Sequence, residues 1–255
     1  MNISTFKISP TASLEEITVQ LNAPFVPEIT ARLLKTIVKF ILLLRGQIPC
    51  SWEQLQSIVE LERERQNLQH FKRKYKKAND LLQSGEALFE DLEKICHCLR
   101  DWETDNIRFL LLIGTTITTP KAIYIINLPT IVSSEAGSNS KAFNACERKL
   151  VRSLVQSLSD EAILRPTRTF LLVETTRNHP LDFLVPKQTF NFHKLKGRAC
   201  SIKLENDCII NESEANEIIS LHSDESVIEM DQDIPEKHLL WFQSKNILPG
   251  LNAIN

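Results

Sequence analysis

The sequence predicts an α+β fold, in which helices cover one face of a largely antiparallel sheet. Helical spacing of apolar residues dominates the first hundred residues, and short apolar runs typical of strands dominate most of the remaining chain. A run of helices followed mostly by strands, without regular alternation of the two, is typical of α+β proteins. We therefore expect one domain with three main helices packed on a sheet.

The composition is that of a globular protein. Of 255 residues, 42% are hydrophobic and 24% are charged, so burial can offset the entropy lost when the chain becomes ordered. A formal net charge of -2 excludes a strong overall attraction to phosphate or anionic lipid. No apolar run approaches the roughly 20 residues that span a bilayer. Six cysteines without a signal peptide indicate reduced thiols, so we expect an intracellular protein.

The beginning of the chain predicts an arm and then a helix. Residues 1–24 show no sustained period and are expected to form a flexible arm, so that the domain spans 25–255. The first helix starts around Pro27, which suits a first helical turn, and runs to Arg45. Its apolar residues recur at helical spacing, and further apolar side chains from Phe40 onward predict a central helix covered on several sides.

Two more helices are predicted before the first long apolar run. Ser51 and Gln54 form a capping-box pattern, in which each side chain bonds to the backbone N–H of the other residue at a helix start. The charged stretch 60–77 is expected to be an exposed helical or loose connection. A seam of apolar residues from Leu81 to Leu99 then predicts a long helix.

The second half of the chain changes period. Residues 107–113 are almost wholly apolar and predict a strand buried on both faces, with 122–128 as its antiparallel neighbour. A third main helix is predicted over 142–158, and residues 211–236, rich in Asp and Glu, predict a mobile acidic loop. Further strands are predicted over 168–175, 189–193, 200–205 and 239–243.

Residues that could carry catalysis or hold a metal are few. Cys96, His97 and Cys98 form the closest candidate, but consecutive helical residues point about 100° apart and cannot share one ion. The histidines are scattered singly, and no glycine motif for phosphate occurs. We therefore predict no catalytic residue, no metal and no cofactor.

A basic run with two aromatic residues, Phe71–Lys77, could contact nucleic acid or serve as an import signal. On a helix its charges would spread around the cylinder, which favours a solvated stretch. We expect neither a nucleic-acid nor a membrane partner. Nucleic-acid binding through residues 72–77 is kept as an alternative that requires a steep salt dependence.

The helix predicted over 142–158 has a more informative surface. Val151 widens its apolar stripe, and Arg148 and Arg152 lie beside it. Such a stripe is either core with a solvated rim, or an apolar centre ringed by arginine that binds another protein. The residues alone leave both interpretations open.

Several segments together resemble the comet family of HORMA-like proteins, which bind the mitotic checkpoint protein MAD-two. The segments are Leu33-Leu-Lys-Thr-Ile37, Arg45-Gly-Gln-Ile-Pro49, Trp52-Glu-Gln-Leu55, Ile107-Arg-Phe-Leu-Leu-Leu-Ile-Gly114, Thr119-Pro-Lys121, Cys146-Glu-Arg-Lys-Leu-Val-Arg152 and Leu240-Trp-Phe-Gln243. No single segment is specific, but their order and spacing over residues 28–245 are. The resemblance implies a HORMA-like domain of three main helices packed on a sheet, similar to MAD-two itself.

The resemblance also implies a docking surface. In the family, the end of the first helix and the third main helix bind MAD-two in its closed conformation. The matching residues here are Leu44 and Arg45 on the first helix, and Arg148, Val151 and Arg152 on the third. A member of the family has a glutamine at the position of Leu44 and a large aromatic residue at that of Val151.

The function implied by the resemblance is that of a non-enzymatic adaptor. Docking blocks the surface on which MAD-two dimerises, and presents closed MAD-two to an AAA+ ATPase of the Pch-two type, which converts it to the open form. This silences the mitotic spindle checkpoint. It places the protein in the nucleus and cytoplasm, and at the spindle or kinetochore in mitosis.

The C-terminal strand leaves a second function open. Another HORMA-like module would grip a peptide of its own partner, in meiosis or DNA repair, through a mobile C-terminal segment that includes Trp241, Phe242 and Gln243. An enzyme is the last alternative, and it would need a cleft that the sequence does not reveal.

Overall fold

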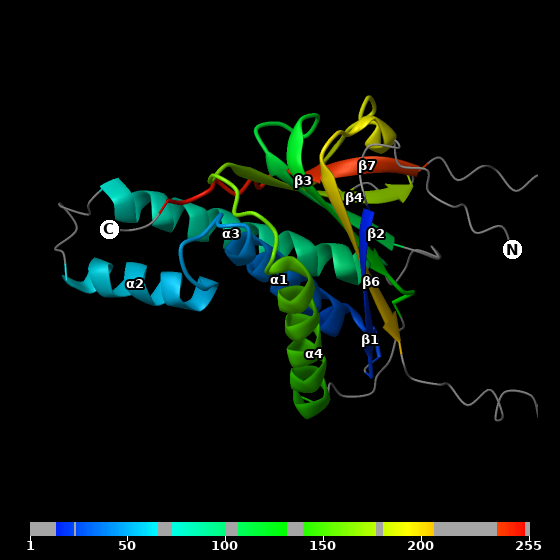
Figure 1. Cartoon of the computed structure of the whole chain (residues 1–255), viewed down its shortest axis with the longest axis horizontal. Helices are drawn as coiled ribbons and strands as arrows, with labels where there is room; N and C mark the ends of the chain where they lie inside the picture. Colours follow the sequence, from blue (N-terminus) through cyan, green and yellow to red (C-terminus); the bar gives the residue numbers. More distant parts are fainter. Residues whose placement is uncertain are drawn as a thin grey trace, which may run out of the picture.

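The computed structural model describes residues 14–22, 24–65, 73–99, 107–131, 140–176, 181–206 and 239–252. Within these ranges, four helices and seven strands form an α+β fold, as the sequence predicts. Figure 1 shows helices α1, α3 and α4 on one side of the sheet, with α2 alongside α3.

The seven strands form one mixed sheet in the order β1-β6-β3-β2-β4-β7-β5. Their bounds are Leu14–Leu21 (β1), Ile107–Gly114 (β2), Pro120–Leu128 (β3), Arg168–Thr176 (β4), Leu184–Pro186 (β5), Arg198–Asn206 (β6) and Leu239–Ser244 (β7). Strand β6 pairs in parallel with β1 and β3, whereas the other four pairings are antiparallel. The prediction of a largely antiparallel sheet, including the β2–β3 hairpin, is confirmed.

Helix α1 (Pro27–Leu44) follows the predicted bounds closely. Pro27 stands in the first turn, where no helical partner for a backbone N–H is needed. Gly46, just beyond the last turn, has a φ of 65°, which lets the chain reverse without strain. The helix is covered on several sides, but Phe40, Leu43 and Leu44 remain partly exposed.

Helices α2 (Trp52–Arg65) and α3 (Arg73–Leu99) confirm the capping box and the long apolar seam. The N–H of Ser51 donates to Oε1 of Gln54 at 3.2 Å, and the N–H of Gln54 donates to Oγ of Ser51 at 3.3 Å. The buried ring of Trp52 then lies on Gly85 of α3, where an added Cβ would come within 2.1 Å of the ring. Gly85 therefore lets α2 pack closely on α3.

Helix α4 (Ser140–Leu158) packs against α1 and β1. The guanidinium of Arg32 lies 3.6 Å from the ring centre of Phe143, and the hydroxyl of Thr36 donates to Oε1 of Glu147 at 2.8 Å. Each pair joins α1 to α4. These contacts bring together the two helices that the resemblance implies for docking.

The core lies on both faces of the sheet. The larger cluster joins side chains of all four helices to one face, and the smaller cluster lies on the other face beneath residues 187–197. The predicted strand at 189–193 is wrong, because this segment contains a 3-10 turn, η1 (Phe192–Lys194). The side chain of Asn191 accepts a hydrogen bond from the N–H of His193 at 2.9 Å, and such local bonding competes with strand pairing.

The prediction of a flexible arm over residues 1–24 is wrong for β1. Residues 14–21 pair in parallel with β6, and Ile17, Val19 and Leu21 are buried while the residues between them are exposed. This alternation is that of a half-buried strand. Residues 1–13, the acidic loop predicted at 211–236 and part of the basic run lie outside the described residues.

None of the helices in the described ranges is long and apolar enough to cross a membrane.

Candidate partner-docking surface

The predicted docking residues on α4 and the end of α1 lie on neighbouring helices. We use the name α1–α4 face for the incompletely buried residues of this surface, which are Phe40, Leu43 and Leu44 on α1, and Arg148, Val151, Arg152 and Val155 on α4. Val155 is 39% exposed, and Val151 and Leu44 are half-buried. The face therefore combines partly exposed apolar side chains from two helices that pack against each other.

Charge on the α4 part of this face is positive. Arg148, Lys149 and Arg152 are all exposed, whereas the acidic neighbour Glu147 is held by Thr36. The Nε of Arg148 donates to the backbone oxygen of Asn144 at 3.1 Å, which holds this side chain along its own helix. An apolar strip bordered by arginine is typical of protein-binding surfaces.

Arg45, which the resemblance implies for docking, is buried and does not reach this surface. Its side chain is 3% exposed and forms an ion pair with Glu161, from the connection between α4 and β4. Its Nη1 also donates to the backbone oxygen of Ala162 at 3.4 Å, and its guanidinium lies 5.9 Å from the ring centre of Tyr124. Arg45 therefore anchors the α4–β4 connection to the end of α1.

A second arginine extends this buried ion pair to the sheet. The Nε of Arg198, on β6, lies 3.3 Å from Oε1 of Glu161, and its Nη2 lies 3.5 Å from Oε2 of Glu15, on β1. The charges connect the end of α1, the α4–β4 connection and two strands. Burial raises the pKa of the nearby Tyr124 hydroxyl to about 12, which keeps the group neutral.

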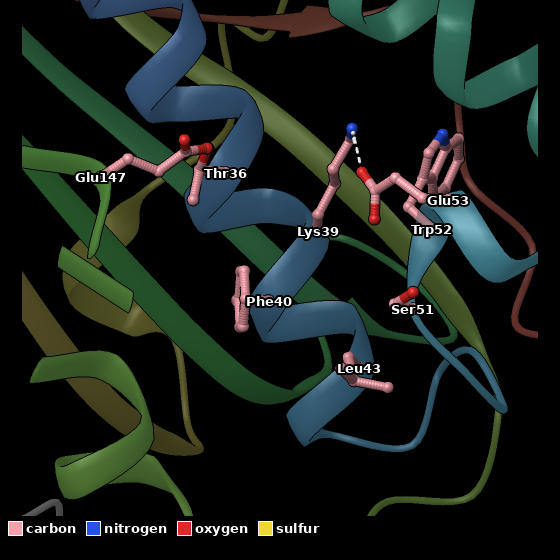
Figure 2. Close-up of a pocket in the computed structure, with 8 residues that line it drawn as sticks. All are labelled: Thr36, Lys39, Phe40, Leu43, Ser51, Trp52, Glu53 and Glu147. Atoms are coloured by element: carbon pink, nitrogen blue, oxygen red, sulfur yellow. Dashed lines mark hydrogen bonds and ion pairs between the residues drawn. The ribbon is translucent and has the colours of Figure 1, made fainter. Parts of the chain in front are cut away.

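A shallow recess of about 90 Å³ lies beside the α1–α4 face, where α1, α2 and α4 meet. It is lined by Thr36, Lys39, Phe40, Leu43, Ser51, Trp52, Glu53 and Glu147. Figure 2 shows the Lys39–Glu53 ion pair, whose atoms are 2.8 Å apart, on the α2 side, and Glu147 beyond Thr36 on the α4 side. Phe40 and Leu43 project from α1 between these two sides. The recess therefore has an apolar middle and charged ends.

Sequence reasoning missed Phe40 and Leu43 as surface residues. Continuous apolar residues at the end of α1 predict burial all round, but Phe40 and Leu43 line the recess between α1, α2 and α4 and stay partly exposed. The sequence does contain one sign of an exposed side on this helix. Lys35 and Lys39 lie one turn apart on the same side of the helix, and charged side chains are expected to face water.

The C-terminal strand residues lie apart from the α1–α4 face. Trp241 is buried against the second face of the sheet, with its ring centre 6.0 Å from that of Phe190, and Phe242 belongs to the helical core. Gln243 pairs with Leu172 of β4 on one side and with Val185 of β5 on the other. This part of β7 is thus paired on both edges by the protein's own strands.

The Cys96, His97 and Cys98 segment separates in space as its helical position implies. Cys96 is buried, whereas the exposed His97 lies 3.9 Å from Glu28. Burial raises the pKa of the Cys96 thiol, so this group is held in its unreactive neutral form. Over the described ranges, no group of three or more His, Cys, Asp or Glu side chains could hold a metal ion.

The helices packed on a mixed sheet define the class of protein: a HORMA-like module built as an α+β domain. The model of the p31comet family, described as Mad1 and Cdc20-bound-Mad2 binding, matches residues 4–212. The chain belongs to the p31comet family, which confirms the resemblance carried by the ordered segments. It is thus a member of a family of Mad2-binding adaptors, Mad2 being the MAD-two protein. Among curated proteins, no sequence matches the chain significantly.

Proposed function

We propose that this chain is a non-enzymatic adaptor whose α1–α4 face binds the closed conformer of Mad2. Binding covers the surface on which Mad2 dimerises, and presents Mad2 to an AAA+ ATPase of the Pch-two type for conversion to the open form. The outcome is silencing of the mitotic checkpoint, with the protein in the nucleus and cytoplasm and at the spindle or kinetochore in mitosis. The observation that carries the proposal is an arginine-bordered apolar face in a domain of the p31comet family.

The apolar part of the face favours a protein partner. Phe40, Leu43 and Leu44 on α1 and Val151 and Val155 on α4 keep apolar area in contact with water. Removing such area from water stabilises a complex by about 25 cal/mol per Å² before the costs of association are subtracted. A protein surface of complementary shape would remove the most apolar area of this face from water, and so would gain the most binding free energy.

The charged part of the face favours an acidic rim on the partner. Arg148, Lys149 and Arg152 are exposed at the border of the apolar strip. Charges at a rim chiefly increase the association rate and select the partner, and their effect weakens as salt is added. We therefore expect Mad2 to present carboxylates opposite α4 when it binds.

The main test compares two locked conformers of Mad2. Purified protein is titrated by isothermal calorimetry with Mad2 locked closed and with Mad2 locked open. The proposal requires binding to the closed form and much weaker binding to the open form. Equal binding to both forms, or no binding to either, contradicts it.

A charge reversal at Arg152 tests where Mad2 docks. Arg152→Glu should weaken binding of closed Mad2 by about tenfold or more, because a carboxylate then faces the acidic rim. The thermal melt should stay nearly unchanged, since Arg152 is exposed. Lys76→Glu, an exposed cation on α3, is the matched control and should bind as the wild type does. Equal losses in both variants would show that only net charge matters.

The ATPase step is tested separately. Closed Mad2, the AAA+ ATPase and ATP are mixed with wild-type protein or with Arg152→Glu, and conversion to open Mad2 is followed by ion-exchange chromatography. Conversion should require the wild-type protein and should slow with the variant. Conversion that is independent of this chain would remove the ATPase step and leave docking intact.

A further inference from the structure

Ile163 is the most exposed of the large hydrophobic side chains in the described ranges, at 78%. It lies in the connection between α4 and β4, two residues after the buried Glu161. A single exposed apolar residue on a loop is ordinary. Ile163 differs from such residues in how firmly it is held and in the surface that it adjoins.

The backbone around Ile163 is held on both sides, and its side chain touches the end of α1. Glu161 forms the buried ion pair with Arg45, and the N–H of Leu164 donates to the backbone oxygen of Arg45 at 3.1 Å. The side chain itself rests on Gly46, where an added Cβ would lie 2.4 Å from Cγ2 of Ile163. Ile163 is therefore exposed on a backbone that is already ordered, so little backbone entropy remains to be lost when a partner covers it.

Ile163 also lies next to the end of α1, where the α1 part of the α1–α4 face ends. Gly46, on which it rests, follows the half-buried Leu44 by two residues at the end of α1. Val155, 39% exposed, stands on the last turn of α4 before the chain enters the connection. Apolar area thus extends from both helices onto the connection that joins α4 to the sheet.

We propose that Ile163 is an apolar anchor for Mad2, and that the docking surface extends from α1 and α4 around the end of α1 onto the α4–β4 connection. This inference rests on the proposed function, because it takes Mad2 as the occupant. Exposed apolar side chains on an ordered backbone lose less entropy on association than those on a mobile loop, and a few such residues carry much of the affinity. The buried Arg45–Glu161 pair then has a role in docking after all, since it positions Ile163.

The test is the affinity of closed Mad2 for Ile163→Ser, measured by isothermal calorimetry. We expect binding to weaken by about tenfold or more, as for the loss of an apolar side chain that carries binding energy. Ile163→Leu should bind within about twofold of the wild type, because it keeps the apolar area. Leu61→Ser is the matched control, since Leu61 is 50% exposed on α2 and outside the surface. Thermal melts of all three variants should match the wild type.

The possible results separate the two proposals. If Ile163→Ser binds within about twofold of the wild type while Arg152→Glu loses binding, the anchor is overturned and docking on α4 stands. If Ile163→Ser and Leu61→Ser weaken binding equally, the effect is unspecific and the anchor is again overturned. If wild-type protein does not bind closed Mad2, the proposed function fails, and the anchor fails with it.

Discussion

The end of α1 and the exposed side of α4 use the same residue type in opposite ways. The family resemblance implies contact with Mad2 for both Arg45 and Arg152, yet Arg45 is buried in an ion pair while Arg152 is exposed. The end of α1 is thus held by a buried charge pair, whereas α4 presents charge to solvent. The comparison shows that residues matched by one family pattern can be either buried or exposed, so the pattern alone does not show which of them are free to reach a partner.

The difference follows from desolvation. Moving the guanidinium of Arg45 out of water is costly, and the cost is offset by the carboxylate of Glu161 and the backbone oxygen of Ala162. Removing Glu161 leaves the buried guanidinium of Arg45 without a carboxylate, whereas Glu161 keeps Arg198 as a partner if Arg45 is removed. Arg152 remains hydrated, so its loss should affect binding and leave stability unchanged.

The largest expected effect is the loss of stability in Glu161→Gln. Breaking a buried pair by removing one charge costs about 3 to 5 kcal/mol. Urea unfolding followed by circular dichroism measures this change. Lys39→Gln is the control, because it breaks the exposed Lys39–Glu53 pair and should cost less than about 1 kcal/mol. Similar losses in both variants would mean that burial of the Arg45–Glu161 pair has no energetic consequence.

A smaller effect is expected at alkaline pH. The pKa of Tyr124, beside Arg45, is raised by burial from 10.0 to about 12, so the folded state favours the neutral hydroxyl. Because the folded pKa is the higher one, this stabilisation is complete below about pH 10 and is lost as the pH rises towards 12. A shift of two units corresponds to about 2 to 3 kcal/mol.

Between about pH 9 and 11, the free energy of unfolding should therefore fall less in Tyr124→Phe than in the wild type, as measured by urea unfolding. Part of the slope should remain, because burial also raises the pKa of the Cys200 thiol to about 12. Identical slopes in wild type and variant would show that Tyr124 ionises in the folded protein as readily as in the unfolded chain.

Local patterns in the sequence predict most of the fold. The first-turn Pro27, the Ser51–Gln54 capping box and the apolar run of β2 all act within a few residues, so their structure follows from propensity and capping. Strand β1 escapes such reasoning because its partner β6 lies more than 180 residues further along the chain. The alternation of Ile17, Val19 and Leu21 is a visible signal, but it is short.

The candidate site is predictable only in part, for a similar reason. The apolar stripe of α4 is a local pattern, and it correctly places Val151 and Arg152 on the incompletely buried side. The burial of Arg45 depends on Glu161, which lies more than a hundred residues away in sequence and has no periodic relation to it. Ile163 lies in a connection without a period, so nothing local distinguishes it from a core residue.

The smallest expected effect distinguishes two arginines within α4. Arg148→Ala should weaken closed Mad2 binding by about twofold, less than Arg152→Ala, because the Nε of Arg148 already donates to the backbone oxygen of Asn144 and leaves less of the guanidinium for a partner. Calorimetry at low and high salt measures the affinity of both variants for closed Mad2. Added salt should narrow the difference between their two losses of affinity, since rim charges are screened. A larger loss for Arg148→Ala would place the centre of the docking surface nearer the start of α4, and so further from Ile163.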